Sequence, residues 1–196
     1  MPWIIDYAMV LEQMKSQGFK SLYYNSGAFG FPDPGMARTV AWVGPDDSTI
    51  KPAAKPFTRP VAEPHEKTLS KMASTLWQKT ITGRVWVMPM SHWAYELDHG
   101  SKDWMPALLE NLDLDPGLLA NRNNGAAIEF SPGETEPFEH FIERLLMMLT
   151  ASDFMIAFPG KQVLCTLHHH KQLWWMTTED SAIEEVEALA LKYAAS

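Results

Sequence analysis

The sequence predicts an α+β domain built on a largely antiparallel sheet with helices packed against it. Helical periodicity and short β-branched runs both occur along the chain, so both element types are expected. They do not follow a strict βαβ order, and three strand-like segments succeed one another near the C-terminus, which favours antiparallel pairing. The 196 residues have the length of one core, so residues 1–196 are expected to form a single domain.

Composition and charge limit the classes of partner. Hydrophobic residues make up 46% of the chain and charged residues 20%, which describes a globular protein with ample material for a core. The formal net charge is -8 at pH 7, so the surface would repel polyphosphate unless its few basic residues gathered on one face. We therefore expect no nucleic-acid partner.

Cysteine usage and the apolar stretches bear on location. Cys165 is the single cysteine, so no intrachain disulfide can form and a reducing compartment fits. The first seven residues lack the basic region of a secretory signal and include the acid Asp6. No uninterrupted apolar stretch approaches the roughly 20 residues that span a bilayer. The sequence thus predicts a cytoplasmic protein with no membrane partner.

The N-terminal third predicts one helix and two short strands. Apolar residues spaced by three and four begin at Trp3 and end before Gly18, which predicts a helix over residues 3–17. The aromatic and β-branched runs 22–24 and 39–43 predict strands. Glycines and prolines between the two runs indicate a long irregular loop, which is a common carrier of function.

A proline-rich extended connector is expected at about residues 45–64. Its prolines recur every four residues and exclude both a helix and a central strand; they are Pro52, Pro56, Pro60 and Pro64. A docking peptide in the polyproline II conformation has three residues per turn and a PxxP spacing. The period of four therefore favours a stiff strap across the surface over a docking peptide.

The central part predicts helices that flank two strands. An apolar stripe from Leu69 to Trp77 predicts a helix over about residues 65–80, with one face on the sheet. The strand expected at 84–88 is apolar on both sides, which indicates that both of its faces are covered. The remaining expected elements are a helix around Leu108 with Pro106 in its first turn, a short helix capped by Asp115 before Pro116, and a strand at 126–130.

The C-terminal third carries the clearest patterns. Its apolar residues follow a helical repeat behind Pro137, at Phe138, Phe141, Ile142, Leu145, Leu146 and Leu149. Strand segments are expected at 154–158, 162–168 and 172–177. The pattern Ser181–Glu184 matches a capping box and predicts the start of a last helix.

The last two strand segments are predicted to pair through a three-residue loop at 169–171. This register gathers the mainly apolar set Val163, Cys165, Leu167, Leu173, Trp175 and Thr177 on one face, whereas a two-residue loop would mix polar and apolar residues on both. Cys165 is then buried beside Trp175. That position argues against a catalytic cysteine, because a nucleophile needs an exposed, activated thiolate.

The opposite face of this hairpin is a candidate ligand-binding surface. It brings Trp174 beside Thr166, His168 and Gln172, so that an aromatic ring is surrounded by polar groups that can confer specificity. A small molecule or a protein partner fits such a surface. The alternative is a helix packed over this face, since the doubly apolar strands imply two covered faces.

The run His168-His169-His170 is the most conspicuous motif. Imidazole is a ligand for zinc, copper and iron, and histidines two apart on a strand point to the same side, so His168 and His170 are candidate ligands of a divalent transition metal. The alternative is conformational. Histidine is among the non-glycine residues that tolerate the positive φ of a tight hairpin, and this interpretation is the favoured one.

Glu96 and His99 are candidates for a third metal ligand or a base. On a helix they would share one face with His92, and they match the E-x-x-H element of di-iron bundles, although the element occurs once. On a strand paired with residues 84–88, His92 and Glu96 would share a face and His99 would lie in the turn before Gly100. The sequence favours the polar strand end.

Three functional hypotheses follow. The first is a non-catalytic domain that binds a small ligand or a protein partner around Trp174, and the sequence favours this one. The second is a metal-dependent hydrolase that uses His168 and His170 with Glu96 or His99. The third is an oligomer subunit whose aromatic residues anchor the interface.

Overall fold

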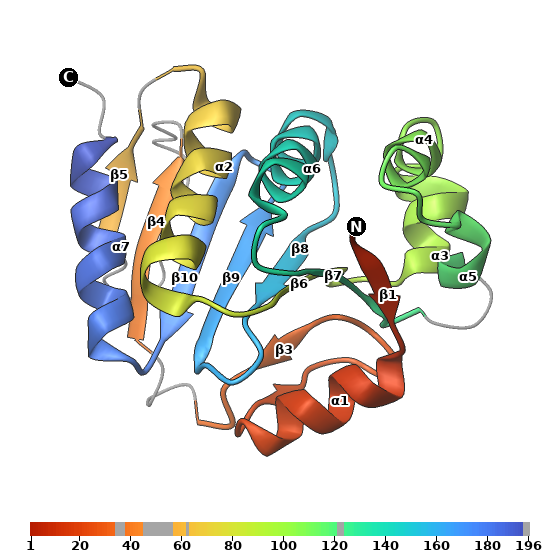
Figure 1. Cartoon of the computed structure of the whole chain (residues 1–196), viewed down its shortest axis with the longest axis horizontal. Helices are drawn as coiled ribbons and strands as arrows, with labels where there is room; N and C mark the ends of the chain where they lie inside the picture. The colour runs from red at the N-terminus through yellow and green to blue at the C-terminus, as the bar shows by residue number, and fades with distance from the viewer. Residues whose placement is uncertain (34–37, 45–56, 62, 121–123, 194–196) are drawn as a thin grey trace.

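The part of the chain that the structure describes forms one eight-stranded sheet in the order β1-β7-β6-β8-β9-β10-β4-β5, and β2 and β3 form a separate pair (Figure 1). This computed structural model describes residues 1–33, 38–44, 57–61, 63–120 and 124–193. The strands are β1 Trp3–Ile5, β2 Lys20–Ser21, β3 Phe29–Gly30, β4 Arg38–Gly44, β5 Phe57–Pro60, β6 Val85–Pro89, β7 Ala127–Phe130, β8 Phe154–Ala157, β9 Val163–His168 and β10 Gln172–Thr177.

The helices interrupt the strands irregularly along the chain. They are α1 Tyr7–Ser16, α2 His65–Leu76, α3 Trp93–Tyr95, α4 Met105–Glu110, α5 Pro116–Ala120, α6 Thr135–Met148 and α7 Asp180–Lys192. Short π-helical segments, Trp77–Ile81 and Glu96–Gly100, continue α2 and α3. In the described part of the sheet β4–β5 is the one parallel pairing and all others are antiparallel. The predicted single α+β domain is confirmed.

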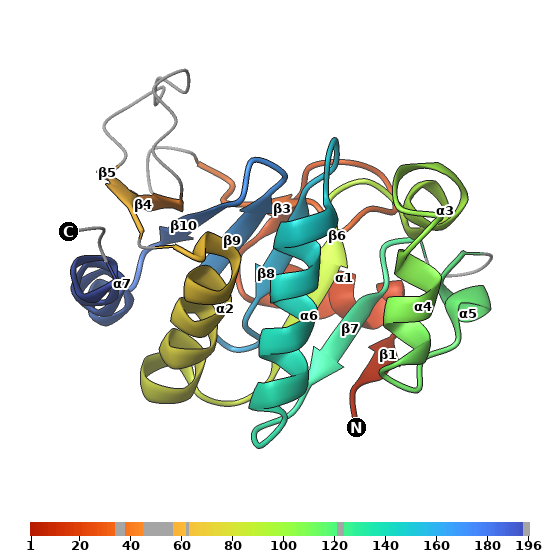
Figure 2. The same ribbon diagram turned by 90° about the horizontal axis from the view of Figure 1, so that it is seen from above.

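The larger core lies on the face that α2, α6 and α7 cover side by side (Figure 2). Phe138 and Phe141 of α6 point inward from the periodic positions that the sequence indicates, and both are fully buried. They pack edge-on or tilted against Phe130 of β7, with ring centroids 5.5 and 5.9 Å apart. The helical repeat of α6 thus becomes one wall of the core, as predicted.

The smaller core lies on the opposite face, under α1. Val10 and Met14 of α1 and Phe29 of β3 pack there against Trp86 and Met88 of β6. The intervening residues of β6, Val85 and Val87, enter the larger core. Both faces of this strand are therefore covered, which confirms the prediction from its doubly apolar sequence.

The first predicted helix starts too early. Trp3–Ile5 is the edge strand β1, paired antiparallel with β7, and the helix begins only at Tyr7. The spacing of four between Trp3 and Tyr7 mimicked a helical repeat, but the β-branched pair Ile4 and Ile5 finds a strand partner instead. The strand predicted at 22–24 is also wrong: β2 ends at Ser21, and the aromatic side chains that follow are exposed.

The predicted connector partly belongs to the sheet. Phe57–Pro60 forms β5, a parallel edge strand next to β4, while residues 45–56 and 62 lie outside the described residues. The strand predicted at 39–43 is confirmed as β4. Proline is compatible with β5 because an edge strand does not need every N–H for a neighbour.

The segment after β6 is helical, so the predicted polar strand end at residues 91–98 is wrong. Trp93–Tyr95 forms α3 and Glu96–Gly100 a π-helical segment. Both edges of β6 are occupied, one by β7 and the other by β8, which leaves no place for a hairpin partner. Long-range pairing therefore decides against the strand.

Candidate functional site

The β9–β10 hairpin has the predicted register. Gln172 pairs with His168 and Trp175 with Cys165, and the loop between the strands has three residues, 169–171. The Lys171 N–H donates to the His168 carbonyl at 3.0 Å, which closes the turn. Alternate side chains consequently divide between the two faces as the sequence indicated.

The left-handed position of this turn falls on Lys171, whose φ is +62°. None of the three histidines, all of which the structure describes, has a positive φ. Tolerance of a left-handed backbone is therefore the wrong explanation for histidine at 168–170. The turn needs that tolerance one residue later, at the position where such three-residue loops usually place glycine.

The inward face of the hairpin is buried in the larger core. Cys165 and Trp175 have no solvent exposure, and the Trp175 ring stacks on Phe158 with centroids 6.2 Å apart. Burial raises the pKa of the Cys165 thiol well above its usual value, because the charged thiolate would lose its hydration. The prediction that Cys165 is buried and not activated is confirmed.

The outward face assembles the four residues predicted to bind a ligand. The His168 imidazole stacks on the Trp174 indole, with centroids 4.2 Å apart and 17° between planes. The indole N–H of Trp174 donates to Gln172 Oε1 at 2.8 Å, and Thr166 pairs with Trp174 across the ladder. Trp174 is half-buried, whereas His168, Gln172 and Thr166 are buried.

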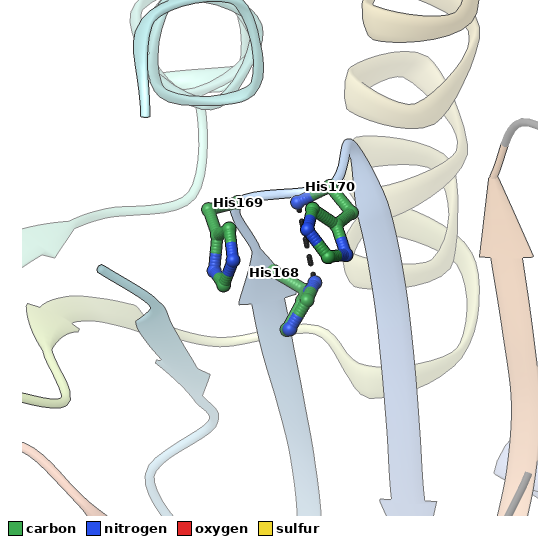
Figure 3. Close-up of side chains that lie close together, drawn as sticks. All are labelled: His168, His169 and His170. Atoms are coloured by element: carbon green, nitrogen blue, oxygen red, sulfur yellow. Dashed lines mark hydrogen bonds between the residues drawn. The ribbon is translucent and has the colours of Figure 1, made fainter. Parts of the chain in front are cut away.

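The three histidines gather at the end of the hairpin (Figure 3). One ring nitrogen from each lies within 4.8 Å of the others. The backbone N–H of His170 donates to Nδ1 of His168 at 3.2 Å, the contact dashed in the figure. His169 is tied to Asp153, whose Oδ1 lies 2.8 Å from the ring Nδ1 and 3.0 Å from the backbone N.

His168 is uncharged at neutral pH. Burial lowers its pKa to about 4, because the imidazolium would lose hydration; Asp153, with Oδ2 3.9 Å from Nε2, opposes this shift, and His169 and His170 add to it. The site therefore presents a neutral imidazole on the Trp174 ring. Its immediate charge comes from the neighbouring Asp153.

The remaining predicted metal residues lie apart from this group. Glu96 is fully buried and accepts hydrogen bonds from the hydroxyls of Ser91, Ser101 and Ser152, at 2.6, 2.9 and 2.9 Å. His99 lies edge-on to Tyr95 with ring centroids 6.1 Å apart. Within the described residues neither joins the histidines in a group of potential ligands.

Two contributors to this group, His169 and Asp153, are not among the site residues predicted from the sequence. Asp153 immediately precedes β8, whose Phe154 pairs with Leu167 of β9. The carboxylate therefore reaches the histidine end of the hairpin only through the β8–β9 register. The sequence signal for this approach is the turn at Pro159 and Gly160, which indicates that the strand before it pairs with β9.

Comparison of the chain with protein-family models, with curated proteins and with solved structures finds no match. Among the described residues, no helix is both long enough and apolar enough to cross a membrane. Fold and site thus define an α+β protein with a histidine-rich hairpin end.

Proposed function

We propose that this chain is a metal-binding protein whose hairpin end holds a divalent transition metal ion through His168, His169 and His170. The observation that carries the proposal is the approach of three ring nitrogens to within 4.8 Å of one another. Nitrogens bound to tetrahedral zinc at about 2.0–2.1 Å lie roughly 3.4 Å apart. Small ring rotations close that difference, because His170 is exposed and His169 half-buried.

The hydrogen bonds of the group support this function. The Asp153 carboxylate accepts a hydrogen bond, so Nδ1 of His169 carries the hydrogen that it donates and Nε2 keeps its lone pair for a metal. A carboxylate behind a ligating histidine is the usual way to fix its ring. The lone pair of His168 Nδ1 accepts a hydrogen bond from the neutral His170 N–H, an interaction worth about 1 kcal/mol that a metal can replace.

Isothermal titration of metal-free, untagged protein with Zn²⁺, Ni²⁺ and Cu²⁺ tests the proposal. We expect one equivalent to bind, His169→Ala to weaken binding by at least roughly tenfold, and Asp153→Asn to weaken it by about 10- to 100-fold. His99→Ala serves as the matched control and should bind like wild type. Absence of binding, or equal binding by His169→Ala, would contradict the proposal.

Two of the earlier hypotheses attach to the same hairpin. Three imidazole ligands leave a fourth zinc position for water, so hydrolysis of an ester by the zinc-loaded protein tests the hydrolase alternative. Binding of an organic ligand at Trp174 stays a prediction, tested by thermal-shift screening of wild type against Trp174→Ala. We also propose a cytoplasmic location and no nucleic-acid partner, on the single buried cysteine and the net charge of -8.

A further inference from the structure

A separate cavity of about 280 Å³ lies beside α1, next to residues of β1, β6 and β7, strands that do not carry the histidines. It is lined by Ile5, Met9, Gln13, Arg84, Trp86, Glu129, Pro159 and Gly160. Drug-sized ligands occupy pockets of about 300–1,000 Å³, so this cavity suits a smaller molecule. Its walls are mostly apolar, but two of its side chains carry opposite charges.

Glu129 is the unusual member of this lining. It sits on β7 between Trp3 of β1 and Trp86 of β6, and its side chain has no solvent exposure. Oε2 accepts the indole N–H of Trp86 at 2.7 Å. Oε1 accepts no hydrogen bond within the part of the chain that the structure describes. A buried carboxylate oxygen without a donor is costly, so Oε1 favours a ligand that brings one.

Arg84 compensates the charge of Glu129 without satisfying that oxygen. Its Nε lies 3.4 Å from Oε1, and 59% of its side chain is exposed. The guanidinium is therefore at the solvent side of the cavity, where a long side chain can pivot without losing core contacts. Its planar fork of donors matches a carboxylate, which it can bind through two parallel hydrogen bonds.

We propose that this cavity binds a small α-amino acid with an apolar side chain. The ammonium group donates to Oε1 of Glu129, the carboxylate binds Arg84, and the side chain lies against Ile5 and Met9. A zwitterion matches the Glu129–Arg84 pair in both charges. A simple amine would meet the positive Arg84, and a simple acid would meet the negative Glu129, so each binds more weakly.

The indole N–H of Trp86 provides the readout, because it donates to the carboxylate that receives the ammonium. Its NMR signal, assigned with Trp86→Phe, is followed in ¹⁵N-labelled, metal-free protein during titration with L-leucine. The matched probes are isoamylamine, which lacks the carboxylate, and 4-methylpentanoate, which lacks the ammonium. We expect L-leucine to shift the signal with saturation and both probes to bind at least roughly tenfold more weakly.

Variants test the assigned contacts. Glu129→Gln preserves shape and an acceptor for Trp86, and Arg84→Gln changes an exposed side chain; each should weaken leucine binding at least roughly tenfold. Glu110→Gln, on α4, is the control and should bind like wild type. The proposal is overturned if leucine leaves the signal unmoved at about 20 mM, if either probe binds equally well, or if Arg84→Gln does not weaken binding. The last comparison decides even if Glu129→Gln fails to fold.

Discussion

At the scale of single residues, His168 shows how burial can override a neighbouring charge. Asp153 lies within 3.9 Å and favours the imidazolium, yet desolvation dominates and lowers the pKa of His168 to about 4. Stacking on Trp174 covers one side of the ring, and the His170 N–H occupies Nδ1. The folded protein thus stabilises the neutral form.

This lowered pKa predicts acid sensitivity of the metal-free protein. The unfolded state takes up the His168 proton near pH 6.5 and the folded state only near pH 4, so folding excludes a proton between these values. We expect the His168 contribution to stability to be fully present above about pH 6.5, to fall by about 1–3 kcal/mol as the pH drops toward 4, and then to level off.

Urea denaturation at a series of pH values measures this effect. The His168→Gln variant lacks the titrating group, so its free energy of unfolding should fall less between pH 6.5 and 4 than that of wild type. His140→Gln, on α6 and away from the hairpin, controls for histidine content. Parallel wild-type and His168→Gln profiles would show that burial does not shift this pKa.

Glu96 has a structural role: it links three segments of the chain through hydrogen bonds, and among the described residues it is not part of the histidine group. Its carboxylate joins Ser91 after β6, Ser101 after the π-helical segment and Ser152 before β8. Glu96→Ala removes the acceptor for three hydroxyls and leaves a cavity, so we expect a loss of about 3 kcal/mol or more in the free energy of unfolding. Glu96→Gln keeps one amide oxygen and should lose less. Equal stability of wild type and Glu96→Ala in urea would refute this role.

At the scale of elements, the β9–β10 turn holds Lys171 in a left-handed backbone conformation. The Lys171 ammonium Nζ donates a hydrogen bond to Oε1 of Glu66 at 2.6 Å, and this hydrogen bond lowers the pKa of Glu66. The pair is partly exposed and contributes at most about 1 kcal/mol. To separate the backbone strain at Lys171 from the loss of the ion pair, Glu66→Gln should be compared with the double variant Glu66→Gln, Lys171→Gly.

Glycine adopts positive φ without steric penalty, so the double variant should be more stable than Glu66→Gln by about 1 kcal/mol. Thermal unfolding of the two proteins measures the difference. A double variant that is no more stable would mean that the lysine backbone is not strained in this turn. Lys171→Gly alone is uninformative because it also removes the ion pair.

Elements with an unambiguous local pattern were predictable from the sequence. The register of β9 and β10 followed from strict alternation, since one shift would have mixed polar and apolar residues on both faces. The capping box was misleading: α7 begins at Asp180 with Glu179 as its N-cap, so Ser181 lies inside the first turn. Trp3–Ile5 forms a strand because it pairs with the distant β7. The predicted strand at residues 91–98 does not form because both edges of β6 are occupied, and the chain is helical from Trp93.

The part of the candidate site that lies within one hairpin was also predictable from the sequence. Thr166, His168, Gln172 and Trp174 come from one hairpin, and alternation alone brings them to one face. Asp153 lies just before β8, and its approach to the histidines depends on the pairing of β8 with β9, which alternation within the hairpin does not predict. The Glu129 cavity needs β1, β6, β7 and α1 together, so no local pattern could have revealed it.

At the scale of the whole molecule, several large apolar side chains remain on the surface. Tyr24 is 93% exposed and Tyr23 64%, and Leu22 next to them is 44% exposed. If the protein is an oligomer with an aromatic interface, the exposed side chains of residues 22–24 are candidates for the residues that anchor that interface. Light scattering tests it, and a monomer at every concentration would remove the need for such an interface.

The two cores share the strands of one sheet, which predicts that the molecule unfolds as one cooperative unit. Val87 of β6 belongs to the larger core and its neighbour Met88 to the smaller one, so neither side can lose its packing without exposing the other. Met14→Ala on α1 and Ile142→Ala on α6 remove fully buried side chains from opposite sides. Each should lower the free energy of unfolding by about 2–5 kcal/mol.

Urea unfolding followed by far-UV circular dichroism and by tryptophan fluorescence distinguishes one unit from two. Trp86 reports on the smaller core, and Trp77, Trp93 and Trp175 report on the larger one. We expect the two signals to change together in wild type and in both variants, with the midpoint shifted by either substitution. A contradicting result would be a separate fluorescence transition of Met14→Ala at low urea, with the circular dichroism signal unchanged. That result would mean that α1 and the smaller core unfold independently while the sheet and the larger core stay folded.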